Sequence, residues 1–147
     1  MTDSRFVYVT YIAVSPEKVW EALVTPEFIK AYFFGVTFDT DWKVGSAWQI
    51  KHPDGRITDA GEILEFVPPS RLVMSWRNEF MPEAKAEGYG RFVAEIEAAG
   101  DVAKLTITHS IDVENSKLIA AVSGGWPRIL SNLKSLLETG SVVLPAK

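Results

Sequence analysis

Hydrophobic and polar positions follow two different periods along this chain. Residues 6–14 are mostly aromatic and β-branched, which is typical of a β-strand. Ser15 can cap a helix, and Pro16 suits the first helical turn. One helical face of the following residues is apolar, at Val19, Trp20 and Leu23. The pattern therefore predicts a strand that passes directly into a capped helix.

The centre of the chain reads as a series of strands after one more short helix. Thr25 and Pro26 repeat the cap-and-proline signal, and the helix that they predict ends near Tyr32. Residues 79–88 are expected to form a loop. Strands are expected at residues 36–42, 47–52, 56–67, 71–78, 89–98 and 102–113. Because consecutive strands with short turns pair antiparallel, we expect one antiparallel sheet with one buried face.

The last part of the chain has a helical period from Lys117 onward. Its apolar stripe comprises Trp126, Ile129, Leu130, Leu133, Leu136 and Leu137. Gly140 is expected to end the helix. Because proline breaks helix interiors, Pro127 predicts a bend or a restart near residues 123–125. The sequence thus predicts one α+β domain over residues 1–147, with this helix covering the buried face of the sheet.

Composition narrows the classes of function. The 147 residues carry a net charge of −4 without a basic run, so a nucleic-acid partner is not expected. The absence of cysteine excludes disulfides and thiol catalysis, and with only two histidines we expect no metal centre and no cofactor. Neither a membrane span nor a signal peptide is present, which favours a cytoplasmic protein without a membrane partner. Five Trp and eight Phe indicate either a large aromatic core or a lined pocket.

Several motifs, taken together, resemble one known superfamily. They are residues 15–23, Asp41 and Gly45 before residues 47–48, Asp54 with Gly55, residues 61–65, residues 68–73 with Trp76, residues 105–109 and residues 125–134. This set is similar to the START-like superfamily, also called the SRPBCC or birch-pollen-allergen-like group. Within it, the chain resembles the family named for the C-terminal domain of activators of the Hsp90 ATPase.

The resemblance implies a helix-grip fold. In that fold a curved antiparallel sheet of about six to seven strands wraps around a long C-terminal helix, two short helices follow the first strand, and a cavity lies between sheet and helix. It implies no single activity, since some members bind lipids, hormones or polyketides and others are cyclases or hydroxylase components. The co-chaperone role belongs to larger proteins with an additional N-terminal domain. Ligand binding is therefore the first expectation, followed by contact with a chaperone, a stress-response role and a homodimer.

Inward-facing side chains are predicted to line this cavity. On each strand the apolar residues share one parity, so they project from the same face of the sheet. The expected ligand-binding residues are Trp48, Ile50, Met74, Trp76, Phe92, His109, Trp126, Ile129, Leu130 and Leu133. A fully packed core without a cavity is the other interpretation, and spacing alone does not choose between the two.

His109 is the candidate for chemistry. It shares the apolar face of its strand with Leu105 and Ile107, where a buried imidazole can act as an acid, a base or a ligand-orienting donor. A structural histidine that is hydrogen-bonded to a neighbour fits the same pattern. Glu65 can lie in the cavity or pair with a basic residue on the surface. Three functions stay open: binding of a small hydrophobic or amphipathic ligand, a cyclase- or hydrolase-type enzyme that uses His109 and a cavity carboxylate, and a chaperone-associated interaction module.

Overall fold

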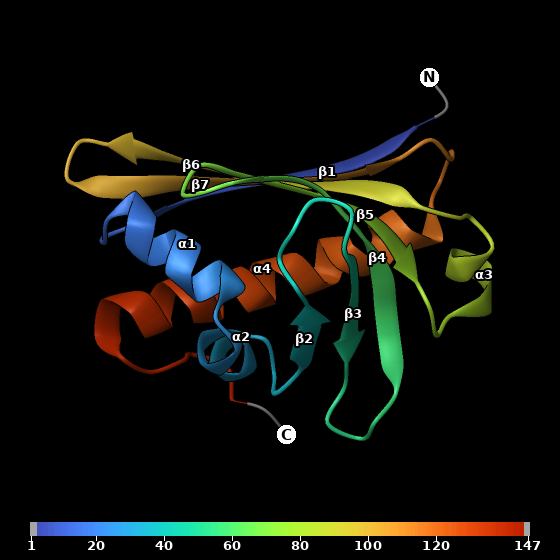
Figure 1. Ribbon diagram of the computed structural model, residues 1–147, viewed down its shortest axis with the longest axis horizontal. Helices are drawn as coiled ribbons and strands as arrows, with labels where there is room; N and C mark the ends of the chain where they lie inside the picture. Colours follow the sequence, from blue (N-terminus) through green and yellow to red (C-terminus); the bar gives the residue numbers. More distant parts are fainter. Residues whose placement is uncertain (1–2, 146–147) are drawn as a thin grey trace.

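Seven strands form one antiparallel sheet, as Figure 1 shows. In the computed structural model, which describes residues 3–145, the strands are β1 (Ser4–Ile12), β2 (Thr37–Thr40), β3 (Ala47–Lys51), β4 (Ile57–Val67), β5 (Arg71–Asn78), β6 (Gly90–Ala99) and β7 (Val102–Ile111). Their order across the sheet is β1-β7-β6-β5-β4-β3-β2, so β1 and β2 form its two edges. The predicted helix-grip fold of the α+β class is confirmed.

β1 starts and ends two residues earlier than the sequence predicts, β2 and β7 are shorter than predicted, and one short helix was not expected. β1 ends at Ile12 instead of residue 14, because the Val14 N–H turns back to donate to the Ile12 carbonyl at 2.8 Å. β2 stops before Trp42, whose φ of 56° is a left-handed conformation that does not continue a strand. The expected loop at residues 79–88 contains α3 (Pro82–Lys85), which starts with a proline at a favoured position.

The two short helices after β1 form as predicted. They are α1 (Pro16–Val24) and α2 (Pro26–Tyr32), and each has a proline in its first turn. The Ser15 hydroxyl accepts a hydrogen bond from the Lys18 N–H at 3.2 Å, so it caps α1 as expected. The Thr25 side chain makes no such bond at the start of α2, so proline and tertiary packing fix that helix instead.

The last helix, α4 (Lys117–Thr139), is continuous, so the predicted bend or restart near residues 123–125 is wrong. Pro127 lies inside the helix and removes one backbone donor. The apolar face is buried on the sheet side from Leu118 to Leu133, and this burial holds both halves of the helix in line. Gly140, with a φ of 87°, ends the helix as expected.

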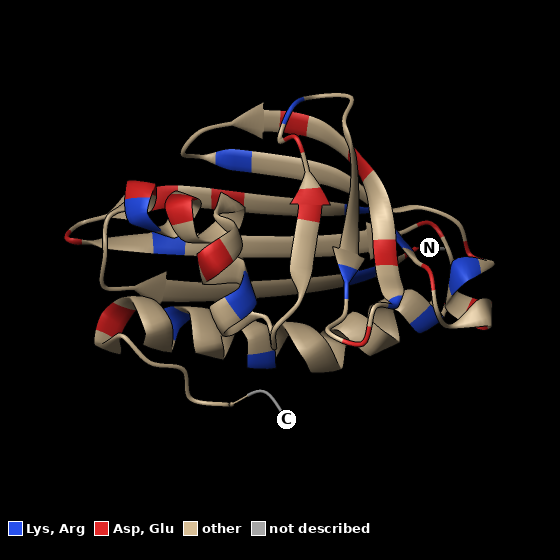
Figure 2. Cartoon of the chain, turned by 60° about the horizontal axis from the view of Figure 1, so that its bottom comes forward, with Lys and Arg blue, Asp and Glu red and all other residues tan. Residues whose placement is uncertain are grey.

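All of the longer helices lie on one side of the curved sheet. Figure 1 shows α4 crossing beneath the strands, with α1 and α2 beside it and the β2–β4 end of the sheet curling toward them. The buried apolar side chains form one continuous core between these two layers. Lys and Arg are scattered among Asp and Glu and do not gather on one element (Figure 2), in agreement with the absence of a basic run in the sequence.

Candidate functional site

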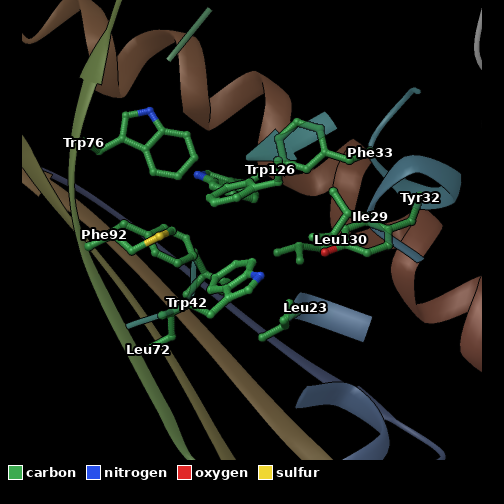
Figure 3. A pocket seen from close by; sticks show the side chains of 13 residues that line it. Leu23, Ile29, Tyr32, Phe33, Trp42, Leu72, Trp76, Phe92, Trp126 and Leu130 are labelled. Carbon is green, nitrogen blue, oxygen red and sulfur yellow. The ribbon is translucent and has the colours of Figure 1, made fainter. Parts of the chain in front are cut away.

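An apolar cavity lies between the inner face of the sheet, α2 and α4 (Figure 3). It holds about 470 Å³ of space free of atoms, part of it open to solvent, but only about 40 Å³ admits the centre of a water-sized sphere. A cavity of that size has room for a few water molecules, so the side chains already fill most of it. Its lining residues are Leu23, Ile29, Tyr32, Phe33, Phe38, Trp42, Leu72, Met74, Trp76, Phe92, Ile107, Trp126 and Leu130.

Half of the ligand-binding residues that the sequence suggests reach this cavity. The five that line it are Met74, Trp76, Phe92, Trp126 and Leu130. The other five are buried in the surrounding core and are not part of the lining: Trp48, Ile50, His109, Ile129 and Leu133. Strand and helix parity therefore identifies the buried face correctly, but it does not distinguish a side chain that lines the cavity from one that packs behind it.

Trp48 shows why an inward tryptophan can stay out of the cavity. Its indole N–H donates to the Ser75 carbonyl at 3.0 Å, which holds the ring flat across the sheet. One face of the ring stacks on Phe38, with centroids 5.0 Å apart and planes 18° from parallel. Phe38 then stacks on Trp42 at 5.1 Å, so Phe38 and Trp42 form the wall at this end.

The wall that α1, α2 and β2 provide was not predicted from the sequence. The cavity was expected between the sheet and α4 alone, whereas Leu23, Ile29, Tyr32 and Phe33 close the side between them. The signal was the run of apolar and aromatic residues that follows the second cap-and-proline motif. Leu72 and Ile107 share strand parity with residues that were named, so applying parity to every inward position would have found them.

His109 is fully buried behind the cavity and has one hydrogen bond. The Trp126 indole N–H donates to His109 Nδ1 at 3.1 Å. Because Nδ1 accepts, the proton of the neutral ring belongs on Nε2, which has no hydrogen-bond partner among residues 3–145. The ring contacts Trp76 and Phe92 edge to face, with centroids 4.9 and 5.8 Å apart. Burial lowers the pKa of His109 to about 3, so the imidazole is neutral at physiological pH.

Neither Asp59 nor Glu65 forms an acid–base pair with His109, because each has other partners. Asp59 accepts a hydrogen bond from the Trp76 indole N–H at 2.8 Å, and burial raises the pKa of this carboxyl. Glu65 lies on the surface, where it forms ion pairs with Arg71 at 3.0 Å and Arg91 at 3.5 Å. The hydrogen bond from Arg71 lowers the pKa of Glu65. Of the two locations that the sequence left open, the structure places Glu65 on the surface.

Tyr32 supplies the hydroxyl group of the lining. The residue is 4% exposed, and Figure 3 shows its oxygen, the red atom, pointing into the cavity between Leu130 and Trp42. Within the described part of the chain, no protein atom forms a hydrogen bond with this oxygen. Burial raises the pKa of Tyr32 well above its usual value, so the phenol stays protonated. The cavity is therefore an apolar space with the neutral Tyr32 hydroxyl directed into it.

Comparison with known families and structures agrees with this architecture. Residues 13–138 match the AHSA1 family, described as activator of Hsp90 ATPase homolog 1-like protein. The chain belongs to the AHSA1 family. The resemblance that the sequence motifs indicated is thereby confirmed. No curated protein matches the chain significantly.

Three solved structures illustrate how far the likeness of this AHSA1 chain extends. A protein from Cytophaga hutchinsonii is 31% identical, with 93% of this chain and 95% of that chain covered and a TM-score of 0.70. The Aha1 dimer from Colwellia psychrerythraea is 21% identical, with 93% and 98% covered and a TM-score of 0.74. An HSP90 activator from Plasmodium falciparum is 20% identical, with 90% and 95% covered and a TM-score of 0.74. The last two, below 25% identity, support the fold alone.

Two further properties of the AHSA1 chain concern metals and membranes. Across residues 3–145, no three His, Cys, Asp or Glu side chains come together as ligands for a metal ion. No helix in that range has the length and hydropathy needed to cross a bilayer.

Proposed function

We propose that the protein binds a small, largely apolar ligand in the cavity between the sheet, α2 and α4. The observation that carries this proposal is the lining: thirteen aliphatic, aromatic or thioether side chains surround about 470 Å³. Ligand sites are typically concave, mostly apolar and supplied with few polar groups. Trp42, Trp76 and Trp126 supply broad, rigid contact surfaces for such a ligand.

The small free volume sets a condition on binding. Only about 40 Å³ is open to a water-sized sphere, so a ligand with a benzene ring must displace side chains. Residues 33–46, which contain β2 and the loops on either side of it, have little regular structure, and this is where we expect the displacement. Ligand binding then stabilises the protein to a degree that grows with the ligand concentration.

The test is a titration with ethylbenzene, followed through the fluorescence of the lining tryptophans and through the thermal midpoint. Wild-type protein is expected to give a saturable change in both. Leu130→Phe places extra bulk in the lining and is expected to weaken binding by about tenfold or more. Leu136→Phe, on the same helix but outside the lining, is the matched control and is expected to bind like wild type. A linear, unsaturable response of the wild type contradicts the proposal.

An acid–base enzyme receives less support from the geometry. Such an enzyme requires a carboxylate or water within hydrogen-bond reach of His109 inside the cavity. The His109 ring faces Trp126, Trp76 and Phe92 instead, and its lowered pKa leaves it a weak base. We therefore regard His109 as a residue that lies behind the cavity and orients the Trp126 ring.

A chaperone-associated role is the second candidate function. The family description and the Plasmodium structure both name activation of Hsp90. On this chain, β1 exposes an apolar stripe along one face, with Val7, Val9 and Tyr11 each about half exposed. Addition of the protein to Hsp90 is expected to accelerate ATP hydrolysis, and Val9→Lys is expected to reduce this effect. An unchanged rate with the wild type contradicts the role.

A homodimer is part of the same proposal, since the Colwellia structure is described as an Aha1 dimer. Light scattering of the purified protein measures its mass directly, and a monomer at all concentrations contradicts it. The cytoplasmic location expected from the sequence stays a prediction.

A further inference from the structure

We propose that the Tyr32 hydroxyl anchors the ligand, donating a hydrogen bond to an oxygen acceptor of an uncharged, mainly aromatic molecule. This inference rests on the proposed ligand-binding function. Tyr32 ends α2, and its ring enters the cavity from the side opposite the sheet (Figure 3). It is 4% exposed, and its hydroxyl has no hydrogen bond to any atom of residues 3–145.

An unpartnered hydroxyl in this position calls for a physical reason. Buried polar groups are nearly always hydrogen-bonded, and leaving one unpaired costs free energy. Phenylalanine would fill the same place without that cost. The Tyr32 hydroxyl is not among the fully enclosed atoms without a partner, so a water or a ligand atom in the cavity can accept its hydrogen bond.

The other polar groups around the cavity are already engaged or open to solvent. The Trp76 indole N–H donates to Asp59, and the Trp126 indole N–H donates to His109. The Trp42 indole also lacks a partner within the described chain, but Trp42 is only half-buried, so solvent can satisfy its N–H. Among residues 3–145, His109 Nε2 is a buried donor without a partner, but His109 lies behind the lining. Tyr32 is the buried lining residue whose donor has no partner in the protein.

The chemistry of the lining defines the ligand class. No Lys, Arg, Asp or Glu side chain is among the lining residues, so a charged ligand would lose its hydration without gaining a counter-ion. The phenol is held in its protonated form by burial and acts as a neutral donor. A carbonyl oxygen on an aromatic body, as in an aryl ketone, matches both the donor and the apolar walls.

A matched pair of ligands and a matched pair of variants test the inference. Acetophenone and ethylbenzene have nearly the same shape, but only acetophenone has a carbonyl where ethylbenzene has a methylene. Their dissociation constants would be measured with the wild type, with Tyr32→Phe, and with the control Tyr11→Phe on the exposed face of β1. We expect Tyr32→Phe to weaken acetophenone binding about 3- to 10-fold while ethylbenzene binds at least as well as before. Tyr11→Phe should change neither constant.

The outcomes separate this inference from the function on which it rests. If ethylbenzene binds the wild type but Tyr32→Phe leaves acetophenone affinity unchanged, or weakens both ligands equally, the anchor role is overturned and cavity binding stands. If neither ligand binds the wild type, the proposed function fails together with the anchor. The thermal midpoint of Tyr32→Phe, expected at or above that of the wild type, confirms that any lost affinity does not come from unfolding.

Discussion

At the scale of single residues, His109 makes stability depend on pH. The pKa of its imidazole is about 3 in the folded protein and about 6.5 in an unfolded chain. Between these values the unfolded chain binds a proton that the folded protein does not. The free energy of unfolding contributed by this residue is therefore complete above pH 6.5 and falls by about 1.4 kcal/mol per unit as the pH drops toward 3.

Chemical unfolding of the wild type and of His109→Gln between about pH 4 and 8 measures this contribution. Glutamine keeps an acceptor for the Trp126 indole but does not titrate, so its unfolding free energy should lose less on acidification than that of the wild type. His52→Gln, in the turn between β3 and β4, is the control for removing a histidine outside the core, and its curve is compared with that of His109→Gln. Parallel curves for wild type and His109→Gln would show that His109 is protonated without cost, and so refute its burial as a neutral group.

At the scale of elements, one glycine in β4 allows the side chain of a β3 tryptophan to reach across β4 and contact β5. Gly61 in β4 lies opposite Trp48 in β3, and the Trp48 indole crosses over it to donate to the Ser75 carbonyl in β5. A Cβ atom at Gly61 would overlap that carbonyl and lie 2.8 Å from the indole nitrogen. The side chain of Ser75 in turn accepts from the Glu62 N–H at 2.9 Å. This close approach of backbone and ring requires glycine.

Two glycine-to-alanine variants should therefore change stability in opposite directions. Gly61→Ala forces strands and indole apart, and we expect it to lower the free energy of unfolding by about 3 kcal/mol or more. Gly124 is exposed in α4, and a methyl group at this position would meet no heavy atom within 4 Å, so Gly124→Ala should raise that free energy by about 0.5–1 kcal/mol. Urea unfolding of both variants gives the two values. A mild effect of Gly61→Ala would mean that Trp48 does not lie across β4.

The sequence predicted the elements whose signals are local. Ser15 and Pro16 start α1, and Gly140 ends α4, because capping depends on a few adjacent residues. The same local reasoning failed at Pro127, where burial of one helix face on the sheet outweighs one lost hydrogen bond. It also overextended β2, which stops before the left-handed Trp42, whose ring stacks on Phe38. The turn residues Asp41 and Gly45 on either side of Trp42 were the local signal for this stop.

At the scale of the whole molecule, the cavity depends on contacts that no local pattern contains. Parity placed Met74, Trp76 and Phe92 on the inner face of the sheet, and all three line the cavity. Parity could not show that Trp48 is held back by its bond to Ser75, or that Tyr32 reaches the cavity from α2. The first fact depends on the pairing of β3, β4 and β5, and the second on where α2 packs, so both are properties of the assembled fold.

This arrangement also determines which wall can move. The sheet wall consists of long strands, β5 to β7, each paired on both sides, whereas β2 has four residues and pairs only with β3. The loop after β2 carries Trp42 in a left-handed conformation, and α2 has only seven residues. Segments with few hydrogen bonds and short length open at the lowest free energy. A ligand larger than the free space should therefore enter by displacing residues 33–46.

Hydrogen–deuterium exchange with and without saturating ethylbenzene tests this route. Since exchange follows local opening, a bound ligand that holds the movable wall closed should slow exchange of residues 33–46 and leave β6 and β7 almost unchanged. Leu130→Phe at the same ligand concentration should show less slowing, because the added bulk weakens binding. Slowing concentrated in β6, β7 or α4 would instead place the opening on the opposite wall, and would make the short edge strand and the Trp42 loop fixed parts of the site.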